Sequence, residues 1–174
     1  MKKSVAAKSP SRAAARFHAM AEAQLRDSRV RVTDARVKVL AALLGAPYAY
    51  SHQDVQDTLA DMDRVTLYRA LDCLTDAGLA HKIAGDDRVF RYNAAAEAHE
   101  HGDKSAPQHR HGHFKCTRCA RVFCIDSMDA SADAALRKEL QSALRAALGR
   151  DFRSHDIELT IKGWCADCAH RHHA

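Results

Sequence analysis

The stretch "DRVTLYRALDCLTDAGLAHKIAGDDRVFRY", residues 63–92, changes its hydrophobic period partway along. Its first part is typical of an amphipathic helix that ends at Gly78, because apolar residues recur at helical spacing at Val65, Leu67, Leu71, Leu74 and Leu79. Residues 79–92 then alternate apolar and polar side chains around Gly85-Asp86-Asp87. That alternation predicts a two-stranded hairpin directly after the helix.

The residues before this stretch predict further helices. Residues 12–27 form an alanine-rich helical segment, Thr33 is placed to cap a helix over 34–44, and Ser51 is placed to cap one over 52–60. A series of helices followed by a hairpin is the order of a winged helix-turn-helix, whose last helix enters the major groove of DNA. We therefore predict a DNA-binding domain over residues 1–92, with a basic tail at 1–11.

The charge distribution agrees with a polyanionic partner. The chain of 174 residues has a formal net charge of +5, and residues 1–38 alone carry ten Lys or Arg against three acids, a net +7. Nucleic acid is one interpretation, and a solvated tail that aids solubility is the other. No apolar run approaches the roughly 18 residues of a membrane span, and the N-terminus lacks the apolar region of a signal peptide. We expect a cytoplasmic protein without a membrane partner.

The second half predicts a small α/β unit over residues 109–174, after a polar linker at 93–108. Short strands are expected at 113–116 and 121–125, a helix at 131–148, and a last strand within 155–165. A unit of this size usually needs a metal, a disulfide or a partner subunit to be stable.

Two Cys-x-x-Cys pairs in this unit predict a metal site. Cys116 and Cys119 form the first pair, and Cys165 and Cys168 form the second. Two intervening residues let both sulfurs reach one ion at about 2.3 Å, and two such pairs complete a tetrahedral zinc site. The alternatives are redox dithiols or disulfides, but neither pair opens a helix after a buried strand as a thioredoxin-like site would.

A second group of soft ligands lies beside the first pair. His109, His111 and His113 alternate, so a strand would place them on one face, and Cys124 follows five residues after Cys119. Thiolate beside imidazole favours zinc over magnesium, calcium or ferrous iron, whereas the other interpretation is a solvated histidine-rich loop. Other histidines and cysteines are less specific candidates. The linker contains His99 and His101, and the C-terminal end contains His170, His172 and His173. His52 could be a surface histidine and Cys73 a core cysteine, whereas His81 starts the hairpin.

Taken together, "RVTDAR" (31–36), "RVTLYRALDCLTDAGLAHKI" (64–83), "HGHFKCTRCARVFC" (111–124) and "GWCADC" (163–168) resemble the ferric-uptake-regulator family of metal-sensing repressors, most closely its zinc-sensing branch. The match runs from Val30 to Cys168. It implies an α+β fold, with an N-terminal winged helix-turn-helix domain followed by a small α/β dimerisation domain that carries a four-cysteine zinc site. It also implies a homodimer that binds palindromic operator DNA, and not an enzyme.

The resemblance implies a sensory metal between the two domains. The family's two alternate histidines match His111 and His113, and the histidine that its zinc sensors use at the start of the wing matches His81. Cys124 stands where an acidic ligand is usual, and His109 is a reserve ligand. Loss of carboxylates and gain of sulfur favour zinc, so we expect one structural and one regulatory Zn²⁺ per subunit.

The remaining expectations concern DNA and the alternatives. Tyr68 and Arg69 are the expected base readers, Thr66 joins them on the same helix, and Arg64, Arg31 and Arg36 are expected at phosphates. An iron- or peroxide-sensing member of the same family is the nearer alternative. A zinc hydrolase is the more distant one, because no carboxylate accompanies the histidines as a general base.

Overall fold

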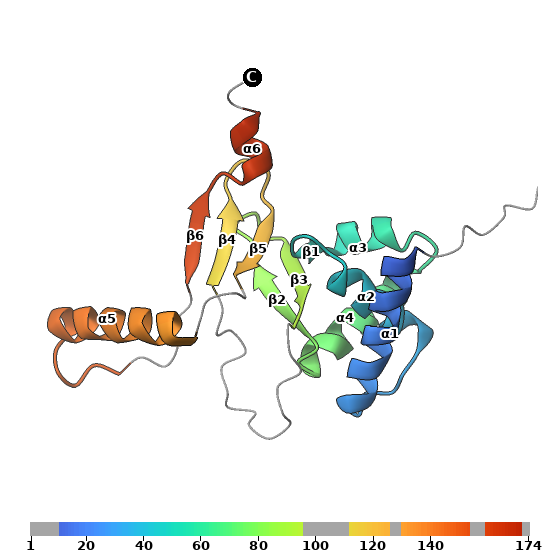
Figure 1. The fold of residues 1–174 in the computed structure, drawn as a ribbon, viewed down its shortest axis with the longest axis horizontal. Coiled ribbons are helices and arrows are strands. Elements are labelled where there is room, and N and C mark those ends of the chain that lie inside the picture. The colour runs from blue at the N-terminus through green and yellow to red at the C-terminus, as the bar shows by residue number, and fades with distance from the viewer. Residues whose placement is uncertain (1–10, 96–111, 126–129, 154–158, 172–174) are drawn as a thin grey trace, which may run out of the picture. The chain divides into compact units, whose positions relative to one another are not determined.

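The computed structural model describes residues 11–95, 112–125, 130–153 and 159–171. The chain divides into two units, Met1–His101 and Gly102–Ala174, which are described in turn (Figure 1). No helix in the described part of the chain is both long and apolar enough to cross a bilayer.

Four helices build most of the first unit: α1 (Arg12–Asp27), α2 (Asp34–Leu44), α3 (His52–Thr58) and α4 (Arg64–Asp76). Each begins at a side-chain cap, provided by Ser11, Thr33, Ser51 and Asp63. The predicted caps Thr33 and Ser51 are confirmed. α3 ends at Thr58, two residues before the predicted end, because Leu59 leaves the helical region with φ −119° and ψ 56°.

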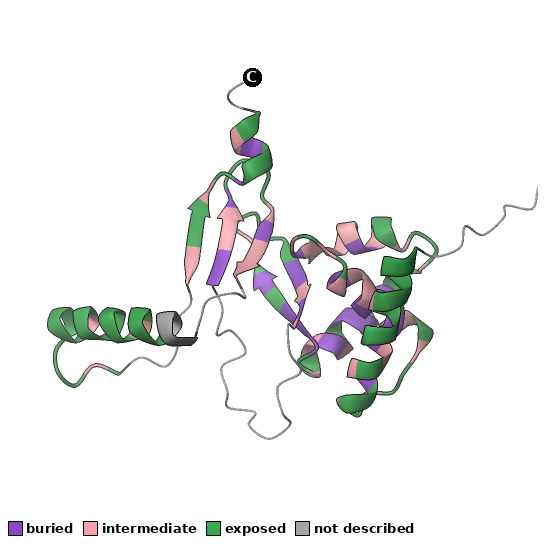
Figure 2. Cartoon of the chain, in the orientation of Figure 1, coloured by how far each residue is buried: buried purple, intermediate pink, exposed green. Residues whose placement is uncertain are grey.

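The core of this unit lies where α1, α2 and α4 meet (Figure 2). Valine, alanine and tyrosine side chains share this core with almost fully buried leucines, each of which contributes about 1.5–3 kcal/mol by leaving water: Leu25, Leu40, Leu43, Leu67, Leu71 and Leu74. The predicted apolar face of α4 is wrong at one position. Val65 is 58% exposed, because it lies on the face of α4 turned away from the core.

A three-stranded antiparallel sheet completes the first unit, in the order β1-β3-β2. Its strands are β1 (Tyr50–Ser51), β2 (Ala80–Ala84) and β3 (Phe90–Ala94). Gly78 ends the turn after α4 with φ +71°, a left-handed conformation that glycine adopts without strain. β3 runs two residues into the predicted linker, because Ala94 still pairs with Ala80.

The second unit contains β4 (Gly112–Cys116), β5 (Val122–Ile125), α5 (Ala130–Leu148), β6 (Thr160–Gly163) and α6 (Ala166–His170). The sheet order is β5-β4-β6, with β4 antiparallel to β5 and parallel to β6. The crossover through α5 is the connection that a parallel pair requires. The predicted order of strand, strand, helix and strand is confirmed, whereas α6 was not predicted.

Candidate metal centre and nucleic-acid interface

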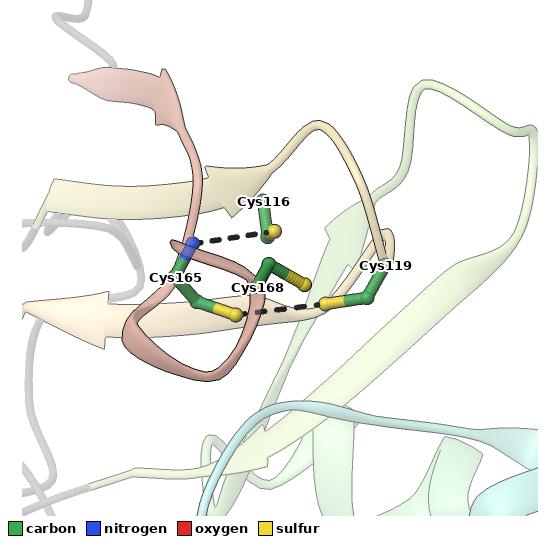
Figure 3. A group of neighbouring side chains, drawn as sticks. All are labelled: Cys116, Cys119, Cys165 and Cys168. Atoms are coloured by element: carbon green, nitrogen blue, oxygen red, sulfur yellow. Dashed lines mark hydrogen bonds between the residues drawn. The ribbon is translucent and has the colours of Figure 1, made fainter. Parts of the chain in front are cut away.

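Four cysteines converge at one end of the second sheet (Figure 3). Cys116 is the last residue of β4, Cys119 follows in the turn to β5, Cys165 precedes α6, and Cys168 lies within it. The parallel pairing of β4 with β6 aligns Cys116 with Gly163, and the Thr117 amide donates to the Gly163 carbonyl at 2.8 Å. Strand pairing thus brings the two Cys-x-x-Cys pairs together although about 45 residues separate them.

The sulfur positions suit a tetrahedral ion. The four Sγ atoms all lie within 4.8 Å of one another, and those of Cys119 and Cys165 are 3.8 Å apart. Zinc–sulfur bonds of about 2.3 Å at tetrahedral angles place sulfurs roughly 3.8 Å from each other. All six cysteines of the chain are free thiols in this structure. The donor set and its spacing therefore fit zinc.

Neighbouring groups hold this cluster in place and affect its ionisation. The Cys165 amide donates to the Cys116 sulfur at 3.4 Å, and an Arg118 side chain donates to the Cys168 carbonyl at 3.1 Å. Burial raises the pKa of Cys116, but amides of Cys165, Cys119 and Arg118 outweigh it and bring the pKa to about 6. Burial together with the neighbouring thiols raises the pKa of Cys168 to about 12. Four thiolates so close together require a bound cation.

A second pair of soft donors lies further along the same sheet. His113 on β4 is opposite Cys124 on β5 in the antiparallel register, and their donor atoms lie within 4.8 Å of each other. His113 is buried and Cys124 is half-buried. An imidazole and a thiol on adjacent strands can bind one ion from one face of the sheet.

The other predicted ligands either lie outside the described residues or belong to the first unit. His111 and His109 lie outside the described residues, as do His99, His101, His172 and His173. His81 is a buried residue of β2 in the first unit, opposite Asn93. Its membership of the site stays a prediction.

The helix α4 exposes side chains that can contact DNA. Tyr68 is 44% exposed, and Arg64 and Arg69 are also exposed. Val65 adds an exposed apolar side chain one turn before Tyr68 and Arg69, a contribution that the hydrophobic pattern of the sequence concealed. Such a face combines cationic groups for phosphate and guanine with apolar groups for the thymine methyl.

The remaining predicted DNA contacts differ in their surroundings. Arg31 is exposed, whereas Arg36 is half-buried and its guanidinium donates to the Arg31 carbonyl at 2.8 Å. The Thr66 amide donates to the Asp63 carboxylate at 2.9 Å, so Thr66 takes part in the cap of α4.

Two groups of interacting side chains in the first unit could not be expected from the sequence. Tyr92 of β3 and His52 of α3 are joined by a hydrogen bond of 3.0 Å between the hydroxyl and Nε2, and His52 is half-buried. Arg91 of β3 donates two hydrogen bonds, at 2.9 and 2.7 Å, to Asp87 in the turn between β2 and β3. A Cβ at Gly85 would collide with the Arg91 guanidinium, which explains the glycine. Both groups join residues whose proximity depends on the tertiary fold.

A winged helix with an exposed cationic recognition helix, followed by a cysteine-rich unit, defines a metal-responsive DNA-binding regulator of transcription. Residues 27–159 match the sequence model of the ferric uptake regulator family, and the chain belongs to this family. Its members are regulators of transcription and not enzymes. The predicted fold class is confirmed, with a DNA-binding domain before a dimerisation domain that carries the four-cysteine cluster.

A relative named FurA and a relative named for zinc uptake resemble the chain to a similar degree. The transcriptional regulator FurA of Mycobacterium tuberculosis is 30% identical over 84% of this chain and 88% of its own length. The zinc uptake regulation protein of Escherichia coli is 28% identical over 86% and 80%. A solved zinc uptake regulator complexed with zinc and DNA has a TM-score of 0.58 at 23% identity, over 92% of this chain and 98% of that one. The metal must therefore be inferred from this chain's own ligands.

Proposed function

We propose that this protein is a zinc-responsive repressor of metal uptake and homeostasis genes, which acts in the cytoplasm as a homodimer on palindromic operators. The observation that carries the proposal is the pairing of His113 with Cys124 across β4 and β5. A thiolate and an imidazole are donors that zinc prefers, whereas an iron or manganese sensor is better served by carboxylates.

The regulatory ion would be held by His81, His111, His113 and Cys124, with His109 in reserve. His81 comes from the hairpin of the first unit, and the others come from the second unit. A bound ion with ligands from both units favours one relative orientation of the two. Its effect on DNA binding is limited to its difference in affinity between that orientation and the others.

The four-cysteine cluster would hold the structural zinc, which gives one structural and one regulatory ion per subunit. Cys116 and Cys119 come from the β4–β5 turn, and Cys165 and Cys168 from the start of α6. An ion there joins two segments that are far apart in the sequence, the β4–β5 connection and α6, so its binding free energy contributes to folding.

On DNA, Tyr68 and Arg69 would read bases, with Thr66 beside them on α4. Arg64, Arg31 and Arg36 would contact phosphates, although the hydrogen bond from Arg36 to the Arg31 carbonyl limits its reach. In a dimer the two α4 helices would enter successive major grooves, about 34 Å apart, and so read a palindrome.

The helix α5 supplies a surface suited to the homodimer. Leucine recurs at every fourth position, which places one apolar stripe along the helix: Leu136, Leu140, Leu144 and Leu148. Leu140 is 39% exposed and Leu148 is 61% exposed. An exposed apolar stripe of this length is typical of a surface that a second copy of the chain covers.

A parallel titration tests the sensed metal. Operator binding by the protein with a filled four-cysteine site is measured against zinc, ferrous iron and manganese at buffered free concentrations. We expect zinc to activate binding at far lower concentrations than the other two. Activation by ferrous iron at the lowest concentration would instead support the iron- or peroxide-sensing function.

A further inference from the structure

The side chain of His52 lies between the wing and the recognition helix. It is the first residue of α3, and its imidazole contacts the Tyr68 ring of α4, with ring centres 4.2 Å apart. On another side it contacts the Tyr92 ring of β3, with centres 4.8 Å apart and planes at 73°. One imidazole therefore touches side chains from two other elements of the same unit.

The backbone that carries His52 is fixed from both sides. The preceding residue, Ser51, pairs with Arg91 of β3. Ser51 and Asp54 also form a reciprocal capping box, with hydrogen bonds of 2.8 Å from the Ser51 amide and 3.2 Å from the Asp54 amide. Because these contacts fix where α3 begins, they also fix the origin of the His52 side chain.

The orientation of the imidazole is set by the hydrogen bond between Nε2 and the Tyr92 hydroxyl. Tyr92 is only 1% exposed, so its hydroxyl needs a protein partner. Burial lowers the pKa of His52, and burial also raises the pKa of Tyr92 to about 12, so both groups are neutral near pH 7. The bond can form with either group as donor, and the ring plane is the same in both cases.

Tyr68 differs from His52 and Tyr92 in being 44% exposed on the surface that meets DNA. An exposed tyrosine loses rotamer freedom when it binds a base, and this loss weakens binding. A side chain already held against a fixed ring loses less. His52, Arg64 and Tyr68 also line one small depression between α3 and α4, so the contact lies at the edge of the same face.

We propose that His52 is a positioning residue for DNA reading, which holds the Tyr68 ring in its binding orientation and is itself held by the Tyr92 hydroxyl. The proposal rests on the proposed base-reading role of Tyr68. It assigns to His52 a function that is neither metal binding nor direct contact with DNA. It also links specificity in the major groove to a strand of the wing.

A double-mutant cycle in full-length, zinc-loaded protein tests this role. The probe is a DNA duplex that the wild-type protein selects from a random library, with an unselected duplex as reference. We expect Tyr68→Ala and His52→Ala each to weaken binding to the selected duplex by roughly three- to tenfold, because an immobilised tyrosine is lost or released. In the His52→Ala background, Tyr68→Ala should cost much less than in the wild type, while binding to the unselected duplex changes little.

Two further variants keep the test decisive. Tyr92→Phe retains the ring packing but removes the hydroxyl that holds the imidazole. In this background Tyr68→Ala should again cost less than in the wild type, although the reduction is smaller. This can be measured even if His52→Ala does not fold. His18→Ala is the matched control, since His18 is an exposed histidine of α1 that does not line this depression. It should bind as the wild type does.

The possible results distinguish a failure of the positioning role of His52 from a failure of base reading by Tyr68. If Tyr68→Ala weakens binding but the effects of Tyr68 and His52 simply multiply, and Tyr92→Phe binds normally, the positioning role is wrong and base reading stands. If Tyr68→Ala leaves selective binding intact, the base-reading role is wrong and the positioning role falls with it.

Discussion

At the scale of single residues, Arg91 shows how one buried side chain holds a turn together. It presents its guanidinium from β3, directly after the turn that follows β2. That guanidinium is 10% exposed at its side chain and binds both carboxylate oxygens of Asp87. The pairing closes the turn between β2 and β3 within the first unit.

The Asp87 pair predicts a pH dependence of stability. The two hydrogen bonds from Arg91 are the main reason that the pKa of Asp87 lies well below its usual range. Its stabilisation is therefore complete above the unfolded pKa, about 3.9, and is lost as the pH falls through the lower folded value. Because the carboxylate is 39% exposed, we expect Asp87→Asn to cost only about 0.5–1 kcal/mol at pH 7.

Thermal unfolding of Asp87→Asn and wild type at a series of pH values checks this prediction. The difference between them should shrink as the pH falls below about 4. Asp61→Asn, at an exposed carboxylate in the turn before α4, is the control and should follow the wild type. A difference that stays constant down to pH 2 would contradict the assigned role of the pair.

Two arginines with different proposed roles predict different effects on DNA binding. Arg69→Ala should weaken binding to a selected duplex by about 1–3 kcal/mol and leave binding to random DNA nearly unchanged, because it removes a base contact. Arg31→Ala should weaken both and reduce the salt dependence by about one ion, because it removes a phosphate contact. Binding measured at several salt concentrations distinguishes them, and equal effects on random DNA would refute base reading by Arg69.

At the scale of elements, local signals in the sequence predicted the helices α1 to α5 and most strands. The caps Thr33 and Ser51 and the turn at Gly78 act within a few residues, so a sequence pattern reveals them. β1 was missed because its two residues form a strand only by pairing with β3, about 40 residues away. α6 was missed because its five residues begin directly after Cys165, include Cys168 and are too few to show a helical period.

The candidate sites also include one that local spacing predicts and others that depend on the tertiary fold. The Cys-x-x-Cys spacing predicted the four-cysteine cluster, because each pair is local and two pairs suffice for one ion. The contact between His52 and Tyr68 could not be predicted, since it depends on how α3 packs against α4. Val65 was assigned to the core because its spacing fits the apolar period, whereas a face that reads DNA also presents apolar groups.

The leucine stripe of α5 predicts the effect of a charge in the dimer interface. Leu140→Lys should shift the protein toward monomer, because it would bury an unpaired ammonium between two copies of the helix. Ser142→Lys adds the same charge on the opposite side of α5, where Ser142 is exposed, and should remain dimeric. Sedimentation or light scattering over a range of protein concentrations checks both, and an unchanged dimer in Leu140→Lys would exclude this stripe from the interface.

At the scale of the whole molecule, cysteine ligands have two different proposed roles, one structural and one regulatory. The four-cysteine cluster lies entirely within the second unit, so an ion there stabilises that unit and cannot by itself report on the first. The proposed regulatory ligands come from both units, so an ion there can change how the units are held for DNA. Cys124 is the residue that separates these two roles, because it belongs to the same sheet as the cluster but not to the cluster.

Replacing Cys124 tests this separation. Cys124→Ser should retain one tightly bound zinc per subunit in the four-cysteine site, lose the second, stay dimeric and lose zinc-dependent operator binding. Metal analysis after gel filtration counts the ions. Cobalt substitution shows the ligand directly, because loss of a thiolate removes its charge-transfer absorption from the second site. His81→Ala should weaken the same site from the other unit.

The competing explanation is that Cys124 only packs as a small apolar side chain, as a half-buried cysteine commonly does. That explanation predicts two zinc ions per subunit and normal repression in Cys124→Ser. Cys73→Ser is the matched control, because Cys73 is also half-buried but lies on α4, outside the cysteine cluster. If Cys124→Ser behaved as Cys73→Ser does, the sulfur ligand would be excluded, and the donor argument for zinc over iron would lose its main support.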